Sequence, residues 1–442
     1  MKRREFIKKA TLTAAGAFVT PYILPSGRLF APSGARKANH VVFVLFGGGI
    51  RNQESVQQRY LLDQGRASSG NIMNNMLTGA APTSNIVYNP WAPVLSNSLQ
   101  SQGVLFKEMR YTTGPTGHYN GHTVAMTGNY TATGLNLNVN PDHPTIFEYY
   151  RKHNSPRETA LKAWWLSEGL GPYPSLNYSR HADYGAEFGA NYLCPSHFVT
   201  GTGFNNLNNA LSYQPDDVTR IETMKDFFDV NFDKSIGDLP GVINTRADKE
   251  LIKTMLLSTL QNISSLNLPL PSGVSTNELS SDLLNIATSW KVLETFKPEL
   301  TVINTFNLDV CHSNFSGYIQ NLHKADYGVG WLWDKIQNDP VLANDTVMIC
   351  MPEHGRNSTP NSLVDANGLN AYDHTSDQNS REIFSLIVGP PGVVKQNVSY
   401  GTAASPVGES VDIVPTIASI LGFDSSIPSG LLPGRVLTEA FI

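Results

Sequence analysis

Cysteine is scarce in this chain of 442 residues, which contains only Cys194, Cys311 and Cys350. Because the number is odd, at least one thiol stays unpaired whatever the pairing. The spacings match neither a zinc knuckle nor a redox pair of cysteines two residues apart, so both kinds of site are excluded. We expect the three cysteines to be small, buried, hydrophobic side chains.

Charged residues are also few, at 16% of the chain, and the net charge is −5 with a pI of about 6.1. The sequence therefore lacks the basic footprint of a nucleic-acid-binding protein, and we expect no nucleic-acid partner. A low charge content with abundant Asn, Ser, Thr and Gly favours an extracytoplasmic protein. Hydrophobic residues make up 40%, which is enough for a full globular core.

A long apolar run is missing from the N-terminal region. Residues 10–24 are moderately apolar but are broken by Gly16 and Pro21, so they are too short and too interrupted for a committed membrane span. Arg3 and Arg4 precede this run and resemble a twin-arginine export signal. This predicts a periplasmic or exported protein that is recognised by the twin-arginine export machinery. The alternative is an uncleaved membrane anchor with a basic cap.

Short apolar runs rich in β-branched residues recur along the chain and are typical of strands buried on both faces. They are His40–Phe46, Val104–Met109, Ala160–Ser167, Leu300–Phe306, Thr346–Met351 and Phe384–Gly389. Between them, apolar residues at helical spacing predict helices. These are Ser55–Gln64, Thr145–His153, Lys249–Ile263, Leu283–Phe296 and Tyr318–Ile336. The alternation predicts an α/β fold, with a mostly parallel central sheet and helices on both faces.

The chain divides into an export signal with its linker, residues 1–38, and one α/β domain, residues 39–442. Residues 169–240 are rich in Gly, Asn and Tyr with weak periodicity, and we interpret them as a cap-like insertion within that domain. An aromatic group in and near it either lines a substrate pocket or packs in the core. Its members are Trp164, Trp165, Tyr178, His181 and Tyr184.

Acidic and histidine residues cluster in the loops beside the last three predicted strands. They follow two of these strands and precede the third, and they are Asp309, His312, Glu353, His354 and His374. Polar groups in open α/β sheets gather at the carboxyl ends of the strands, so we expect these side chains to converge. Taken singly, each is more simply a surface hydrogen-bonding group. Together they predict a site for divalent metal ions, with zinc favoured and manganese or calcium as alternatives.

A loop rich in Thr, Gly and His follows the strand Val104–Met109 and leads into a predicted helix at Thr123–Met126. Hydroxyl groups at a helix start meet its positive dipole end and free amides, which favours an anionic phosphoryl or sulfuryl group. Beside a metal ion, such a hydroxyl becomes a nucleophile. The alternative is simple helix capping. The candidates are Thr116 as nucleophile, Thr113 as second choice, and His118 and His122 as phosphate-steadying groups or general acids.

These motifs, in this order, resemble those of the alkaline phosphatase and sulfatase superfamily. Glu353-His354-Gly355 is similar to the family's Asp-His-Gly motif, and His374 to its last ligand. Asp309 and His312, followed by Asp326 in a helix, are similar to its earlier motif. The segment Val411–Gly422 is similar to a characteristic structural helix of the family.

Within the superfamily, the match is closest to an exported, DUF1501-like branch, because Glu353–Arg356 is followed by Asp373 and His374. The resemblance extends over residues 40–442 and is strongest at 300–430. It implies an alkaline phosphatase-like three-layer sandwich. It also implies a metal-dependent hydrolase that acts on phosphoric or sulfuric esters of small molecules or polymers.

Two departures motivate an alternative function. Family members carry a metal-binding Asp after the first strand, whereas this chain has Gly47–Gly49 there, with Asn52 or Glu54 as possible substitutes. No Cys or Ser stands where a formylglycine would form, which disfavours an ordinary sulfatase. The alternative is a non-catalytic binding or structural protein on a degenerate scaffold of this family.

Overall fold

A computed structural model of the chain describes residues 35–132, 139–154, 159–168, 176–195, 235–236, 239–240, 242–261, 266–375 and 377–442. The predicted export signal and much of the predicted cap-like insertion lie outside these residues. Within the described ranges, every helix is too short or too polar to span a membrane.

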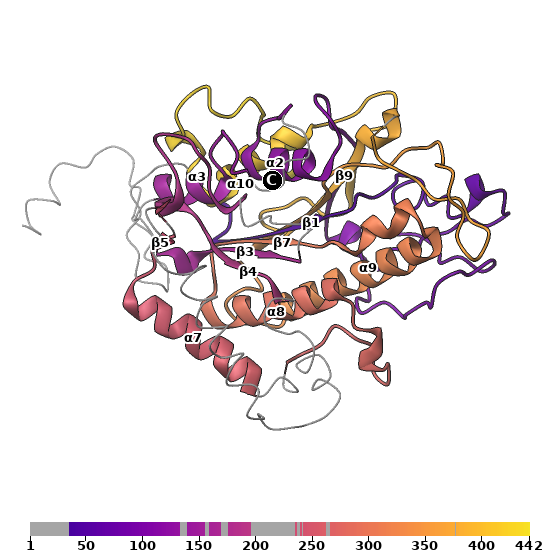
Figure 1. Cartoon of the computed structure of the whole chain (residues 1–442), viewed down its shortest axis with the longest axis horizontal. Helices are drawn as coiled ribbons and strands as arrows, with labels where there is room; N and C mark the ends of the chain where they lie inside the picture. Colours follow the sequence, from indigo (N-terminus) through magenta and orange to yellow (C-terminus); the bar gives the residue numbers. More distant parts are fainter. Residues whose placement is uncertain are drawn as a thin grey trace, which may run out of the picture.

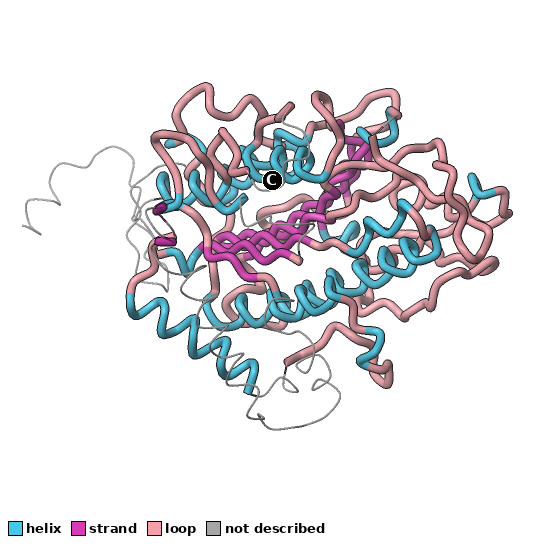
Figure 2. The backbone as a smooth tube through the Cα atoms, in the orientation of Figure 1, coloured by secondary structure: helices cyan, strands magenta, loops and turns pink. Residues whose placement is uncertain are grey.

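An eight-stranded sheet runs through the centre of the molecule, with the strand order β10-β2-β9-β8-β1-β7-β3-β4 (Figures 1 and 2). In this sheet β9 runs antiparallel to both of its neighbours, and every other neighbouring pair is parallel. The strands are β1 (His40–Phe46), β2 (Gly103–Arg110), β3 (Ala163–Ser167), β4 (Asn191–Leu193), β7 (Leu300–Asn304), β8 (Thr346–Pro352), β9 (Glu382–Val388) and β10 (Val398–Tyr400). A separate two-stranded ribbon consists of β5 (Ser235–Ile236) and β6 (Leu239–Pro240).

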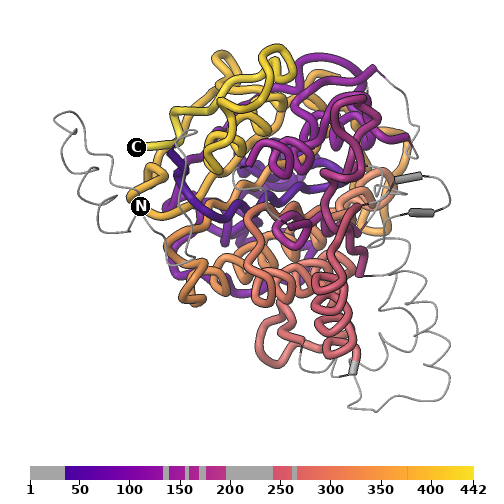
Figure 3. The backbone as a smooth tube through the Cα atoms, turned by 90° about the vertical axis from the view of Figure 1, so that its left-hand side faces the viewer, coloured from indigo at the N-terminus to yellow at the C-terminus, as the bar shows by residue number. Residues whose placement is uncertain are grey.

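Two helical layers cover the sheet (Figures 1 and 3). The burial of the β1 side chains explains why both faces of the sheet are covered. Successive side chains of a strand point to opposite faces. Val42 and Val44 pack into the layer formed by α8 (Ser281–Phe296) and α9 (Phe315–Gln337), whereas Val41 and Phe43 pack toward the other layer. That layer consists of α2 (His118–Thr127), α3 (Ile146–His153) and α10 (Ile413–Leu421). The predicted α/β class, with a mostly parallel sheet and helices on both faces, is confirmed.

In a third apolar cluster, α7 (Arg246–Gln261) packs against β3 and β4. Trp164 belongs to this cluster and stacks on Phe296 at a centroid distance of 5.2 Å. Trp165 is also fully buried, so both tryptophans are core residues. The three cysteines are buried and form no disulfide with one another, as predicted.

The predicted helix over Ser55–Gln64 is wrong, because this segment forms turns and a short 3-10 helix at Leu62–Gln64. Gln58 and Leu61 have φ angles of 51° and 59°, which an α-helix does not allow. A tertiary contact replaces the helix, since the buried Arg51 guanidinium pairs with Asp63 across the segment.

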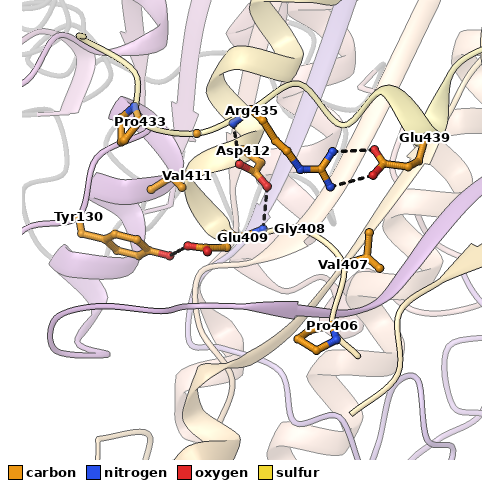
Figure 4. A pocket seen from close by; sticks show the side chains of 11 residues that line it. Tyr130, Pro406, Val407, Gly408, Glu409, Val411, Asp412, Pro433, Arg435 and Glu439 are labelled. Atoms are coloured by element: carbon orange, nitrogen blue, oxygen red, sulfur yellow. Dashed lines mark hydrogen bonds and ion pairs between the residues drawn. The ribbon is translucent and has the colours of Figure 1, made fainter. Parts of the chain in front are cut away.

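The C-terminal segment Val411–Gly422 starts α10 and anchors the last residues of the chain (Figure 4). Asp412 accepts hydrogen bonds from the Glu409 amide at 2.9 Å and from the Arg435 amide at 2.8 Å. A surface hollow of about 650 Å³ beside them is lined by Tyr130 and by the ion pair of Arg435 with Glu439, among others. The Asp of this motif is therefore structural, as its resemblance to the family's helix implies.

The direction of β9 determines where the polar loops meet. The loops after β1, β2, β7 and β8 lie at the carboxyl edge of the parallel strands. Because β9 runs the other way, the loop that precedes it reaches the same edge. His374 lies in this loop. A histidine that precedes its strand therefore reaches the same edge of the sheet as residues that follow theirs.

Candidate metal centre

Five predicted ligands converge at this edge of the sheet, together with His118 from the start of α2. Two sets of potential ligand atoms form there, each with all members within 4.8 Å of one another. The first ligand group is His118, Asp309, His312 and His374. The second ligand group is His118, Glu353 and His354. Both groups are formed by the described residues alone, and His118 belongs to each.

Three of the histidines have one ring nitrogen bound to an acceptor behind the ring. The Nδ1 atoms lie 2.6 Å from Asp373 Oδ1 for His312, 2.7 Å from the Gly355 carbonyl for His354, and 2.6 Å from the Thr116 carbonyl for His374. A carbonyl or carboxylate oxygen accepts, so each Nδ1 carries the proton. Each Nε2 is then an unprotonated ligand atom, which is the usual arrangement of metal-binding histidines.

Burial keeps two of these rings neutral. Desolvation lowers the pKa of His354, and it lowers the pKa of His374 with a further contribution from the neighbouring His354 and His118 rings. The His354 and His374 rings stack with a centroid distance of 4.1 Å. Neutral imidazoles are the form that binds metal ions.

Glu353 is fully buried at the centre of the second ligand group. Its Oε1 atom accepts a hydrogen bond of 2.6 Å from the Gly48 amide and lies 3.2 Å from His354 Nε2. Burial by itself raises the pKa of Glu353, but the charges of His122 and His118 outweigh it and hold the pKa well below its usual range. The group is therefore a carboxylate, as a metal ligand has to be.

His122 stands behind Glu353 and lies outside both ligand groups. Its Nδ1 atom pairs with Glu353 Oε2 and is 2.8 Å from the His118 carbonyl, and its Nε2 atom is 2.6 Å from Asn304 Oδ1. Burial lowers the pKa of His122, but Glu353 and Asn304 raise it above its usual value. The structure thus places His122 as a buried cation that neutralises and orients Glu353.

Asp309 anchors the first ligand group and has an arginine behind it. Its Oδ1 atom lies 2.8 Å from Arg356 Nη2 and 3.1 Å from His312 Nε2. Burial by itself raises the pKa of Asp309, but the hydrogen bond from His118 and the charges of His118 and Arg356 outweigh it and lower the pKa, so the group is ionised. Arg356 and Asp373 entered the sequence analysis only as part of a family motif, although both stand next to predicted ligands.

The two predicted nucleophiles lie outside both ligand groups. Thr116 is 2% exposed, and its hydroxyl donates a hydrogen bond to the His374 carbonyl and lies 3.3 Å from Ser380 Oγ. Since the Thr116 carbonyl accepts from the His374 ring, this threonine holds His374 at two points. Thr113 is exposed.

Packing explains why the loop after β1 has no metal-binding Asp. A Cβ atom on Gly49 would lie 2.5 Å from His354 Nδ1, and one on Gly48 would lie 2.3 Å from the Asp309 amide nitrogen. Both glycines also have positive φ angles, of 94° for Gly48 and 73° for Gly49. The Asp309 backbone and the His354 ring therefore fill the space where a side chain would stand.

The possible substitutes for that Asp are engaged elsewhere. The Asn52 amide donates a hydrogen bond of 2.9 Å to Glu108, and Glu54 pairs with Arg51 at 3.3 Å. Asp326, which matched the family's helix Asp, accepts hydrogen bonds from the amides of Asn75 and Met76 on the α9 side of the sheet. Asn52, Glu54 and Asp326 all lie outside the two ligand groups.

The donor set fits divalent ions such as zinc. The first ligand group offers three imidazoles and a carboxylate, which is a complete tetrahedral set. The second offers two imidazoles and a carboxylate, which leaves a fourth position for another ligand. Solvent reaches the first group, where the side chains of His312 and Asp309 are 36% and 23% exposed.

Searches against protein-family models and against curated proteins found no match. Solved structures that are similar include a protein in the alkaline phosphatase superfamily from Vibrio parahaemolyticus, with 11% identity, a TM-score of 0.44, and coverage of 99% of this chain and 79% of that one. Another is a phosphonate monoester hydrolase from Silicibacter pomeroyi, with 14% identity and a TM-score of 0.42. The match covers 90% of this chain and 76% of that one. Both TM-scores lie below 0.5, and the fold class rests on the sheet itself.

Proposed function

We propose that this chain is an exported, metal-dependent hydrolase of phosphoric or sulfuric esters in the alkaline phosphatase and sulfatase superfamily, closest to its DUF1501-like branch. The observation that carries the proposal is the pair of ligand groups at the carboxyl edge of the sheet. The order of the motifs in the sequence supports the family. Export rests on the twin arginines alone.

The protein's own groups prepare this site in two ways. Acceptors on Nδ1 fix the tautomers of His312, His354 and His374, so their Nε2 atoms are ready to bind. Buried cations, His122 and Arg356, hold the carboxylates ionised. Contacts within the protein therefore hold the framework around the ligands, which reduces the ordering cost of binding.

Divalent ions held by these ligands would polarise an ester oxygen and lower the pKa of an attacking hydroxyl group or water. The start of α2 lies beside them and contributes the positive end of a helix dipole. A phosphate or sulfate ester carries the negative charge that both features attract. Substrate reaches the site from the exposed side, past His312 and Asp309.

The test combines metal analysis with an activity screen. The purified mature protein is analysed for bound metal and assayed on phosphomonoesters, phosphodiesters and sulfate esters. We expect divalent metal in the wild type and hydrolysis of at least one ester class. His374→Ala should lose the ion of the first ligand group and the hydrolysis, whereas His143→Ala, which changes an exposed histidine outside the two ligand groups, should keep its metal and its activity. A protein that binds no metal, and that added metal does not activate, would contradict the proposal.

A binding protein on the same scaffold is the second candidate, and the position of Thr116 favours it. The hydroxyl of this predicted nucleophile donates to the His374 carbonyl and lies outside the two ligand groups. Under this candidate the ions are bound but no ester is cleaved. Stoichiometric metal together with inactivity on all three ester classes would select it.

A further inference from the structure

His118 is held differently from the other three histidines of the ligand groups. Those rings have Nδ1 bound to an acceptor behind the ring and direct only Nε2 at the ligand atoms. The His118 ring has ligand atoms at both nitrogens. Its Nδ1 atom is 2.7 Å from Glu353 Oε1, and its Nε2 atom is 3.2 Å from Asp309 Oδ1.

The two nitrogens face different ligand groups. Nδ1 also lies 3.3 Å from His354 Nε2, while the Asp309 oxygen beyond Nε2 lies 3.1 Å from His312 Nε2. Ligands that share one zinc ion at bond lengths of about 2.0–2.1 Å lie roughly 3.3 Å apart in a tetrahedral site. The separations of 3.3 Å on the Nδ1 side and 3.2 Å on the Nε2 side are those of ligand atoms around an ion, whereas the 2.7 Å contact with Glu353 Oε1 is a hydrogen-bond distance.

We infer that His118 binds two metal ions at once, one through each ring nitrogen, as a bridging imidazolate. This rests on the metal-binding part of the proposed function and not on the hydrolysis of an ester. The ring gives up the protons of both nitrogens to solvent when both ions are bound. The result is a dinuclear centre whose two ions share a protein ligand.

The backbone around His118 fixes the ring for this role. His118 is the first residue of α2, and its carbonyl lies 2.8 Å from His122 Nδ1 one turn later. A Cβ atom on Gly121 would lie 2.8 Å from the Glu353 carbonyl, so the helix packs directly against the strand end that carries the second ligand group. The ring thus enters between the two groups from a rigid element.

The alternative is that His118 is a protonated clamp between Glu353 and Asp309 and binds no ion. The two roles differ in what its removal does to metal binding. A bridge contributes to both sites, so His118→Ala should weaken binding of both ions, by at least about 100-fold each, since even the outer partners of metal ligands contribute 10–100-fold. His374→Ala and His354→Ala should each weaken one ion only.

The experiment uses the full-length protein, freed of metal by a chelator and reloaded with Zn²⁺ or Cu²⁺. We expect two Zn²⁺ ions per chain by elemental analysis. In the Cu²⁺-loaded wild type, the imidazolate couples the two spins, so electron paramagnetic resonance should show loss of the signal of isolated Cu²⁺. His118→Asn, which offers one oxygen donor and tests the role if the alanine variant fails to fold, should show isolated Cu²⁺ only. His143→Ala is the matched control and should keep the coupled spectrum.

Two ions with uncoupled spectra in the wild type would overturn the bridge while leaving metal binding intact. A single ion per chain, or weakening of only one ion in His118→Ala, would also overturn it. Absence of any bound metal would overturn the bridge and the proposed function together. A coupled centre that hydrolyses no ester would support the bridge and contradict only the proposed function.

Discussion

At the scale of single residues, His122 and Glu353 form a buried pair of opposite charges behind the ligand groups. Removing one partner of such a pair leaves an uncompensated buried charge, which costs about 3–5 kcal/mol. We expect His122→Ala to lower the free energy of unfolding by about that amount, as measured by urea unfolding with a chelator present.

The double variant His122→Ala/Glu353→Gln is the control for this prediction. It removes both charges, so it should be less destabilised than the sum of the two single variants. Additive effects would show that His122 and Glu353 do not interact as a charge pair.

Thr116 belongs to the same scale, because its hydroxyl and carbonyl both contact His374. A hydrogen bond of this kind contributes about 0.5–1.5 kcal/mol. We therefore expect Thr116→Val to weaken metal binding by roughly 2-fold to 13-fold and Thr116→Ser to restore it, as measured by competition with a chromogenic chelator.

The same variants test the predicted nucleophile. A Thr116→Val protein with normal metal content but no turnover would show that the hydroxyl attacks the ester, and would contradict a purely positioning role. Thr113→Val serves as the comparison, since Thr113 is exposed and was the second candidate.

At the scale of elements, the glycine loop after β1 lets the backbone approach both ligand groups. Gly49→Ala would place a methyl group 2.5 Å from His354 Nδ1 at a φ of 73°. We expect a loss of stability above the usual cost of about 1–3 kcal/mol for a strained backbone, together with weaker binding of the ion of the second group. Thermal unfolding and metal titration measure the two effects.

Gly368→Ala separates strain from steric conflict. Gly368 has nearly the same φ, of 74°, but an added Cβ would meet nothing within 4 Å. This variant should show the strain cost with unchanged metal binding. Equal loss of metal binding in both variants would mean that His354 is not the contact that matters.

The elements also show how far local pattern predicts structure. The six predicted strands all exist, because continuous apolar runs are buried between two helical layers and leave little choice of conformation. The helix expected at Ser55–Gln64 is absent, because the ion pair of Arg51 with Asp63 holds that segment in a series of turns. Sequence spacing carries no information about such a contact.

At the scale of the whole molecule, buried acids make stability depend on pH. Asp326 is fully buried, and desolvation raises its pKa from 3.8 to about 7 despite hydrogen bonds from Asn75 and Met76. Between these two values the folded state keeps a proton that the unfolded state has lost. The unfolding free energy should therefore fall as pH rises from about 4 to about 7, by at most about 1.4 kcal/mol per pH unit for this group.

Asp326→Asn removes this titration, so urea unfolding between pH 4 and 7 should show a shallower decline than in the wild type. Asp334→Asn on the same helix is the control, since it makes the same substitution at a partly exposed position. An identical slope in Asp326→Asn and the wild type would contradict the assignment.

The sequence by itself determined the fold class and predicted which acidic and histidine side chains gather at one edge of the sheet. The fold class follows from apolar periodicity, which depends only on neighbouring residues. The site follows from strand ends that a parallel sheet brings to one edge, because five side chains stand beside them: Asp309, His312, Glu353, His354 and His374. The antiparallel direction of β9, which brings His374 to that edge, is not visible in its apolar pattern. It depends on which strands pair.

Only the tertiary structure decided what each polar side chain faces. His118 and His122 are one helical turn apart and looked equivalent as candidates, yet His118 has ligand atoms at both ring nitrogens and His122 is a buried cation outside both ligand groups. Arg356 and Asp373 became second partners of ligands through contacts with residues some 50 to 60 positions away. Such roles depend on distances between atoms far apart in the chain, which no local pattern of residues records.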